Sequence, residues 1–178
     1  AVPGADEALL TLGSPTGPLS GQGPARTVRR LERRWGDAIG RPHVVACRSA
    51  AAAARLAATS LDLGPGDEVV FPVDALATAA ALTAGTDAVP VFVDLDPQTL
   101  HLDPVAVDAA ITGRTRAILA VDAHGSAADY QALGRVAARY DLVIVEDGSE
   151  ALGAVYHHQP VGSLAPVSFC GLSDSFYG

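Results

Sequence analysis

This 178-residue sequence contains no lysine, so all 12 of its basic residues are arginine. A phosphate-binding loop of the G-x-x-x-x-G-K-[ST] type requires a lysine and is therefore excluded. No G-x-G-x-x-G fingerprint follows an expected strand, and no serine lies in a G-x-S-x-G elbow. The sequence thus also lacks the motifs of dinucleotide-binding folds and of α/β-hydrolases.

Sulfur and long apolar runs are also scarce. Cys47 and Cys170 are the only cysteines. Their spacing predicts neither a disulfide framework nor a metal site, so we expect two buried structural thiols. No apolar run approaches the ~18 residues of a membrane span, and the sequence does not start with a charged-then-apolar signal segment. These absences predict a soluble, cytoplasmic protein without a membrane partner.

The formal net charge of −8 argues against a nucleic-acid partner. Five arginines nevertheless lie close together, and they interleave with Val28, Leu31 and Trp35 in the pattern of an amphipathic helix. We expect this helix to begin at Pro24 and to end near Gly36, with a solvated basic face rather than a phosphate-binding tract. The five arginines are Arg26, Arg29, Arg30, Arg33 and Arg34.

Residues 142–153 (LVIVEDGSEALG) have the pattern around which the rest of the chain is organised. Their four consecutive aliphatic residues, without polar alternation, are typical of a strand that is buried on both faces of a parallel sheet. Glu146 and Asp147 follow directly, at the carboxyl end of this strand, where open α/β sheets bind ligands. A carboxylate there can hold a cationic ring nitrogen, which is the first indication of function.

Strands and helices are predicted to alternate along the chain with short connections. This alternation predicts the α/β class, with one mostly parallel sheet and helices on both faces. Residues 1–22 are rich in Gly, Pro and Ser, so we expect an N-terminal arm or loop there, and residues 23–178 then form one domain. The expected strands are 43–47, 68–71, 90–93, 116–121, the strand that begins at 142, and 167–172. The expected helices are 50–61 with Ser49 as N-cap, 74–83 with Asp74 as N-cap, 103–111 with Asp103 as N-cap, and 127–140; a hairpin is expected over 154–161.

Several other polar residues lie at turns of the predicted sheet. His124 ends the strand over 116–121 and serves either a ligand or a structural hydrogen bond. Asp94 and Asp96 follow a strand, but no lysine is present to steady a phosphate, so turn carboxylates are the better interpretation. His157 and His158 are adjacent in the hairpin, where neighbouring side chains point to opposite faces, so a solvated turn is favoured over a metal pair.

The turn Ser49-Ala50-Ala51 joins a strand to a helix whose first turn consists of small residues. Free N–H groups at a helix start, together with the helix dipole, suit a phosphate. Every parallel α/β protein has such turns, so this feature alone does not specify a function.

A series of short motifs occurs in this chain with the spacing of a known family. The collinear match runs from residues 19–24 (LSGQGP) to 161–164 (VGSL), and its most specific parts are 63–69 (LGPGDEV), 91–94 (VFVD), 102–104 (LDP) and 145–147 (VED). Together these segments resemble the DegT/DnrJ/StrS family of pyridoxal-phosphate (PLP)-dependent aminotransferases. The resemblance implies the N-terminal part of an aspartate-aminotransferase-like large domain (PLP fold type I), incomplete at its C-terminal end. It also implies the transamination of keto sugars, aminocyclitols or related antibiotic precursors, usually by homodimers.

The same resemblance implies roles for several residues. Asp147 matches the aspartate that pairs with the protonated pyridine nitrogen and keeps the ring an electron sink. The turn at Ser49 falls on a Ser-Gly-Thr turn that holds the phosphate, without the threonine hydroxyl. Leu76 falls where an aromatic side chain stacks on the ring, and Glu150 replaces a glutamine near the ring's phenolic oxygen. The cofactor-binding set, with PLP implied by resemblance only, is Asp147, Ser49, Ala50, Ala51, Leu76 and Glu150, with His124 as a further candidate.

Two departures from the family pattern limit what this chain is expected to do. An ungapped count places Phe176 where the family has the lysine that binds PLP as a Schiff base, and residues 173–178 (SDSFYG) offer no amine in any register. We therefore predict no catalytic residue. Family members are also much longer, and their next strand lies between the last strand seen here and the first. Without it, strand 43–47 is expected to lack a neighbour, which implies a continuation past Gly178 or a partner chain that completes the sheet.

Three hypotheses about function follow. The leading one is a degenerate or non-catalytic aminotransferase-like subunit of sugar or secondary-metabolite biosynthesis, in a homodimer or in a heterodimer with an aminotransferase-like chain. The first alternative is an active PLP-dependent aminotransferase of a keto sugar or related precursor that is seen only in part. The second is a non-enzymatic module that binds a keto sugar or a phosphate ligand at Asp147. Lysine-based catalysis by these residues is not expected.

Overall fold

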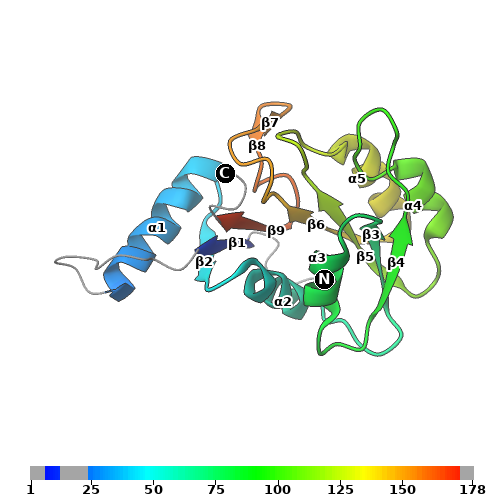
Figure 1. Cartoon of the computed structure of the whole chain (residues 1–178), viewed down its shortest axis with the longest axis horizontal. Helices are drawn as coiled ribbons and strands as arrows, with labels where there is room; N and C mark the ends of the chain where they lie inside the picture. The colour runs from blue at the N-terminus through cyan, green and yellow to red at the C-terminus, as the bar shows by residue number, and fades with distance from the viewer. Residues whose placement is uncertain (1–6, 13–23, 173–178) are drawn as a thin grey trace.

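The computed structural model describes residues 7–12 and 24–172, and its main feature is one seven-stranded parallel sheet. The strands lie in the order β2-β1-β9-β6-β5-β3-β4 (Figure 1). The predicted α/β class with a mostly parallel sheet is therefore confirmed. The strands are β1 (Glu7–Leu12), β2 (His43–Cys47), β3 (Glu68–Pro72), β4 (Val89–Val93), β5 (Thr115–Val121), β6 (Val143–Asp147) and β9 (Val167–Leu172).

Helices cover both faces of this sheet, as predicted. Successive strand residues point to opposite faces, so β3 contributes Val69 and Phe71 to one core and Val70 to the other. The first core is closed by α2 and α3, and the second by α4 and α5. The helices are α1 (Pro24–Ile39), α2 (Ala50–Ser60), α3 (Leu76–Thr83), α4 (Pro104–Ala110) and α5 (Tyr130–Tyr140); the predicted hairpin consists of β7 (Val155–Tyr156) and β8 (Gln159–Pro160).

Two of the three predicted helix caps are present. The Ser49 side chain caps α2 and the Asp103 side chain caps α4. Asp74 does not cap α3: the helix begins at Leu76 with Ala75 as its N-cap, the Ala75 N–H bonds to the Pro72 carbonyl, and the N-cap makes no side-chain hydrogen bond. The cap prediction for Asp74 is therefore wrong, because the chain turns before the helix starts.

The helix expected over 127–140 begins later, at Tyr130, with Asp129 as its N-cap. The preceding residues are held in a turn: Ser126 N–H bonds to the Ala123 carbonyl at 3.0 Å, and Ala128 N–H bonds to Asp122 Oδ1 at 2.9 Å. These bonds fix a turn over residues 123–128, and the helix begins after it.

Strand β1 corrects the prediction for the N-terminal segment. Residues 7–12 were expected to belong to an arm or loop, whereas they pair in parallel with β2 on one side and β9 on the other. The expectation that strand 43–47 lacks a neighbour is therefore also wrong, because β1 fills that place. The division into an arm over 1–22 and a domain over 23–178 stays a prediction, since residues 1–6 and 13–23 lie outside the described ranges.

The two cysteines are free thiols; Cys170 is buried and Cys47 is partly exposed. No helix in the described part of the chain is long and apolar enough to cross a membrane. The same residues contain no cluster of three or more His, Cys, Asp or Glu side chains that could hold a metal ion. The two hairpin histidines, His157 and His158, are both exposed and form the turn between β7 and β8.

Candidate functional site

The centre of the candidate site is Asp147, the last residue of β6, which is 6% exposed. Its Oδ1 accepts hydrogen bonds from the Ser149 backbone N–H (3.1 Å) and hydroxyl (2.5 Å), and its Oδ2 accepts one from the Thr78 hydroxyl (3.2 Å). Burial raises the pKa of Asp147, and the bonds from Ser149 and Thr78 oppose that rise. Within residues 24–172 no arginine or histidine pairs with this carboxylate, so it is a buried acid without a cation.

Ser149 connects Asp147 to the neighbouring strand β9. Its hydroxyl donates to Asp147 and accepts a hydrogen bond from the Gly171 N–H at 2.8 Å. Gly171 is closely packed, since a Cβ at this position would lie 3.3 Å from the Ser149 hydroxyl oxygen and 3.6 Å from the Cβ of Ala50. The side chain of Asp147 and the start of α2 are thus joined through Ser149 and Gly171.

The start of α2 presents free backbone donors at this edge of the sheet. Ser49 is the N-cap, and its hydroxyl accepts a hydrogen bond from the Ala52 N–H at 3.2 Å. Ala50 and Ala51 are exposed, and no acceptor in the described ranges takes their N–H groups. Two free N–H groups at the positive end of a helix dipole form an anion-binding arrangement.

Leu76 and Thr78 both belong to α3, but side chains two residues apart on a helix point to different sides of it. Thr78 donates to Asp147, and Leu76 begins the helix two residues earlier, with 64% of its surface exposed. Leu76 is thus an exposed aliphatic side chain rather than an aromatic ring, and its position beside a ligand stays a prediction.

Glu150 and His124 are brought together by the backbone. The Glu150 carbonyl accepts a hydrogen bond at 3.1 Å from the N–H of Gly125, the residue after His124. Both side chains are exposed, and the Glu150 charge adds to burial in raising the pKa of Asp147. The His124 ring makes no hydrogen bond to another described residue, which leaves its ligand-facing role as a prediction.

A second buried acid, Asp122, lies beside Asp147. The Asp122 N–H bonds to the Asp147 carbonyl at 2.9 Å, and its carboxyl group accepts hydrogen bonds from the Ala128 N–H (2.9 Å) and the Tyr130 hydroxyl (3.2 Å). Burial, together with the nearby Glu146 carboxylate, raises the pKa of Asp122 to about 8. Asp122 therefore carries a proton at neutral pH and fixes the turn that leads into α5.

Glu146 fixes the segment that leads into β9. Its carboxylate accepts hydrogen bonds from the backbone N–H groups of Gly162, Leu164 (2.8 Å) and Ala165 (3.1 Å). Burial raises the pKa of Glu146, although these backbone bonds oppose the rise. Of the two carboxylates that end the organising strand, Glu146 is thus structural and Asp147 faces the candidate site.

The sequence did not single out Ser149, Thr78, Gly171 or Asp122. Asp122 follows β5 as closely as Asp147 ends β6, so its position at a strand end was a usable signal. Ser149, Thr78 and Gly171 act through contacts between segments that are distant in the sequence, and no local pattern marks them.

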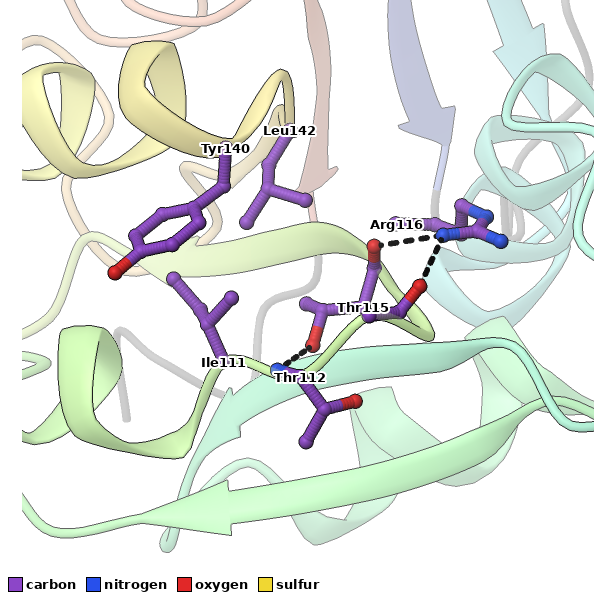
Figure 2. Close-up of a pocket in the computed structure, with 7 residues that line it drawn as sticks. Ile111, Thr112, Thr115, Arg116, Tyr140 and Leu142 are labelled. Carbon is purple, nitrogen blue, oxygen red and sulfur yellow. Dashed lines mark hydrogen bonds between the residues drawn. The ribbon is translucent and has the colours of Figure 1, made fainter.

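A separate cavity of about 310 Å³ opens at the opposite, amino-terminal edge of the sheet (Figure 2). Several of its polar groups already have protein partners: the Thr112 N–H bonds to the Thr115 hydroxyl at 2.9 Å, and Arg116 pairs with Asp67 at 3.1 Å. None of the candidate site residues lines it. The lining residues are Ile111, Thr112, Gly113, Thr115, Arg116, Tyr140 and Leu142.

The sequence profile of the DegT/DnrJ/EryC1/StrS aminotransferase family matches residues 19–178. An L-glutamine:2-deoxy-scyllo-inosose aminotransferase from Streptomyces lividus is 41% identical over 154 residues, which are 86% of this chain and 36% of that relative. A UDP-2-acetamido-2-deoxy-3-oxo-D-glucuronate aminotransferase from Pseudomonas aeruginosa is 36% identical over 141 residues, or 79% and 39% of the two chains. The chain therefore spans about two fifths of the length of these relatives.

Solved structures show the same relationship. The crystal structure of 3-amino-5-hydroxybenzoic acid synthase matches with a TM-score of 0.78 at 32% identity, over 82% of this chain and 38% of that one. The sugar aminotransferase Spr1654 of Streptococcus pneumoniae, in its PLP form, matches with a TM-score of 0.76 at 33% identity, over 83% and 41% of the two chains. The sheet described above is therefore part of a PLP fold type I large domain, and the chain belongs to the DegT/DnrJ/EryC1/StrS aminotransferase family.

Proposed function

We propose that this chain is a non-catalytic, aminotransferase-like subunit of sugar or aminocyclitol biosynthesis, whose residues hold a pyridoxyl phosphate cofactor without a covalent bond. Such a cofactor, when bound, supplies an electron sink for chemistry at an amine-bearing carbon. The observation that carries the proposal is the buried Asp147 carboxylate, which has no cationic partner among the described residues, in a sequence without lysine.

The environment of Asp147 fits a protonated pyridine nitrogen. A buried carboxylate is costly unless it is paired or fully hydrogen-bonded. Ser149 and Thr78 supply only neutral donors, so a cationic ring nitrogen would add the missing opposite charge. The chemistry of these donors therefore supports the role that the family position implies for Asp147, which is to pair with the protonated pyridine nitrogen.

The start of α2 fits the phosphate end of the same group. Ala50 and Ala51 have N–H groups that no acceptor in the described ranges takes. Ala50 lies close to Gly171, which is hydrogen-bonded through the Ser149 hydroxyl to Asp147. Ser49 orders this turn as the N-cap. The change from threonine to Ala51 removes one hydroxyl donor but leaves the backbone donors in place.

Three other features of these residues favour binding without catalysis. No primary amine is available on a side chain, because the sequence has no lysine, and the expected lysine position, Phe176, lies outside the described residues. Leu76 offers less contact to a ring face than an aromatic side chain would. Glu150 adds a negative charge near the site, which disfavours a phenolate on the cofactor ring.

The ligand class and the partners are proposed from the relatives. One relative is an aminotransferase of 2-deoxy-scyllo-inosose, and another of a UDP-linked 3-oxo sugar acid. We therefore propose a keto sugar or ketocyclitol as the second ligand of the site, with His124 and Glu150 at its rim. The proposed assembly is a homodimer or a heterodimer with an aminotransferase-like chain.

The test is an equilibrium-dialysis titration of the purified chain with PLP, compared with its Asp147→Asn and Asp108→Asn variants. Asp108 is the matched control, because it is a partly exposed acid that pairs with Arg139 away from the site. We expect Asp147→Asn to weaken binding about tenfold or more, since a charge-assisted hydrogen bond contributes roughly 1.5–3 kcal/mol. Asp108→Asn is expected to bind as the unmodified chain does.

Two results would contradict the proposal. One is an unchanged affinity of the Asp147→Asn variant while circular dichroism shows that it is folded. The other is the absence of saturable PLP binding by the unmodified chain.

A further inference from the structure

Helix α1 carries a row of positive charges, here called the arginine stripe: Arg26, Arg29, Arg30, Arg33 and Arg34. Their spacing of three and four residues places them on one side of the helix. All five are exposed, as the sequence predicted, and none forms an ion pair with another residue in 7–12 or 24–172.

The charges of the stripe are not balanced within α1. Like charges three or four residues apart destabilise a helix, and cations near its start oppose the helix dipole. The helix contains two acids, Glu32 and Asp37, so α1 carries +3 while the remaining residues carry −11. Glu32 is also engaged elsewhere, because its Oε1 accepts the Ala46 N–H at 2.9 Å. The helix therefore keeps an excess of positive charge that an acidic surface could complement.

Apolar side chains flank the arginine stripe. Val28, Leu31 and Trp35 are only partly buried, and Val45 on the adjoining strand β2 is 40% exposed. Arginine and tryptophan side chains beside exposed aliphatic groups are typical of protein–protein interfaces rather than of a purely solvated helix face.

An opposite charge lies at the other end of the sheet, beside β4. Four aspartates that follow β3 and β4 in the sequence lie there and are here called the aspartate patch. Backbone hydrogen bonds hold their segments together: the Val73 N–H bonds to the Val93 carbonyl at 3.0 Å, and the Asp103 N–H bonds to the Asp94 carbonyl at 3.4 Å. None of the four pairs with a basic residue of the described chain. The patch consists of Asp74, Asp94, Asp96 and Asp103.

Exposed apolar residues surround the aspartate patch as they do the arginine stripe. The side chains of Val73, Leu100 and Val105 are between 48% and 76% exposed. Each face therefore combines a charge of one sign with apolar groups that a partner would cover.

We propose that the arginine stripe of one copy of this chain docks on the aspartate patch of a second copy. The two faces lie at opposite ends of the sheet, α1 beyond β2 and the patch beside β4 (Figure 1). A contact between two different faces is heterologous, so it links copies head to tail. Individual exposed ion pairs are weak and are screened by salt, so the association is weak and depends on ionic strength.

A charge-swap experiment tests this contact on the full chain. Variant one carries Arg30→Glu and Arg33→Glu, and variant two carries Asp74→Lys and Asp94→Lys. The four side chains are exposed and make no hydrogen bond to a described residue, so both variants are expected to fold, which circular dichroism checks. Arg55→Glu, an exposed arginine of α2, is the control.

Sedimentation velocity at about 10 mM and about 500 mM salt gives the readout, because the Debye length falls from about 30 Å to a few ångströms over this range. The unmodified chain and the Arg55→Glu control are expected to associate more at low salt than at high salt. Each double variant alone should lose this salt-dependent association, and an equimolar mixture of the two should regain it. The variants carry net charges of −12 and −4, so a regained association cannot arise from net-charge attraction.

The proposal is overturned if the unmodified chain sediments identically at both salt concentrations. It is also overturned if either double variant still associates in a salt-dependent way, or if the mixture behaves as the sum of its parts. Persistent association of a double variant, or a mixture without new association, would mean that the arginine stripe binds a different acidic partner or none.

Discussion

Asp122 is expected to make the folded chain more stable in mild acid than in mild alkali. Burial beside Glu146 raises its pKa from 3.8 to about 8, so the folded chain binds a proton that the unfolded chain releases. This contribution to the free energy of unfolding is complete below about pH 4, declines as the pH rises, and is absent above about pH 8. The slope in between is that of one proton, about 1.4 kcal/mol per pH unit, so stability is expected to fall by roughly 2–3 kcal/mol between pH 5.5 and pH 7.5.

The Asp122→Asn variant isolates this contribution. An asparagine amide resembles the protonated carboxyl group, because its oxygen can accept the Ala128 N–H while its NH₂ group donates toward Glu146. Urea unfolding of both proteins at half-unit steps from pH 5.5 to 7.5 gives the two pH dependences. The variant should lose stability with rising pH less steeply, by about 1.4 kcal/mol per unit. Exposed Asp94, as Asp94→Asn, is the control and should follow the unmodified chain.

Parallel stability curves for Asp122→Asn and the unmodified chain would refute this reasoning. They would mean that Asp122 is already ionised in the folded chain at pH 5.5 and that another group compensates its charge. A variant that unfolds at every pH would point instead to the Tyr130 hydroxyl bond as the main contact of Asp122, and Tyr130→Phe would then reproduce the loss.

Three further predictions concern single side chains. Ser149→Ala removes the hydroxyl between Asp147 and Gly171. Urea unfolding at pH 7 should show that the free energy of unfolding falls by about 1–3 kcal/mol, because buried polar groups lose their partner. An unchanged free energy would mean that water replaces the hydroxyl. Leu133→Ala empties a fully buried position of α5 and should cost about 2–5 kcal/mol in the same assay, whereas a cost below that range would show that the core collapses around it. Glu68 should give the opposite pH dependence to Asp122: the Thr112 hydroxyl bond, followed by Arg114, lowers its pKa from 4.5, so its contribution is present above about pH 4.5 and is lost as the pH falls. Glu68→Gln should therefore flatten the acid limb of the stability curve, and an unchanged limb would contradict this assignment.

The features that the sequence predicted correctly are those with a local physical cause. The unbroken aliphatic run before Glu146 and Asp147 predicted a strand buried on both faces, and β6 does end at Asp147. Ser49 precedes a run of small helix-forming residues and does cap α2. The arginine spacing predicted an exposed helix face, and all five side chains are exposed.

The features that the sequence did not predict depend on distant segments. Residues 7–12 (EALLTL) are a short, mostly apolar stretch within a Gly- and Pro-rich segment, and their pairing with β2 and β9 makes them a strand. Asp74 has the composition of a cap, but the turn after β3 forms first. The donors to Asp147 come from α3 and from the residues after β6, so their meeting point becomes visible only in the folded chain.

The central claim is that these residues hold a pyridoxyl phosphate group without capturing it covalently. The most direct measurement is the intact mass of the chain after incubation with PLP and borohydride, followed by peptide mapping. Because the 178 residues contain no lysine, a side-chain adduct cannot be confused with background labelling of lysines. The account predicts saturable PLP binding with no borohydride-stable adduct on any side chain; an adduct mapped to a side chain of this chain would contradict it.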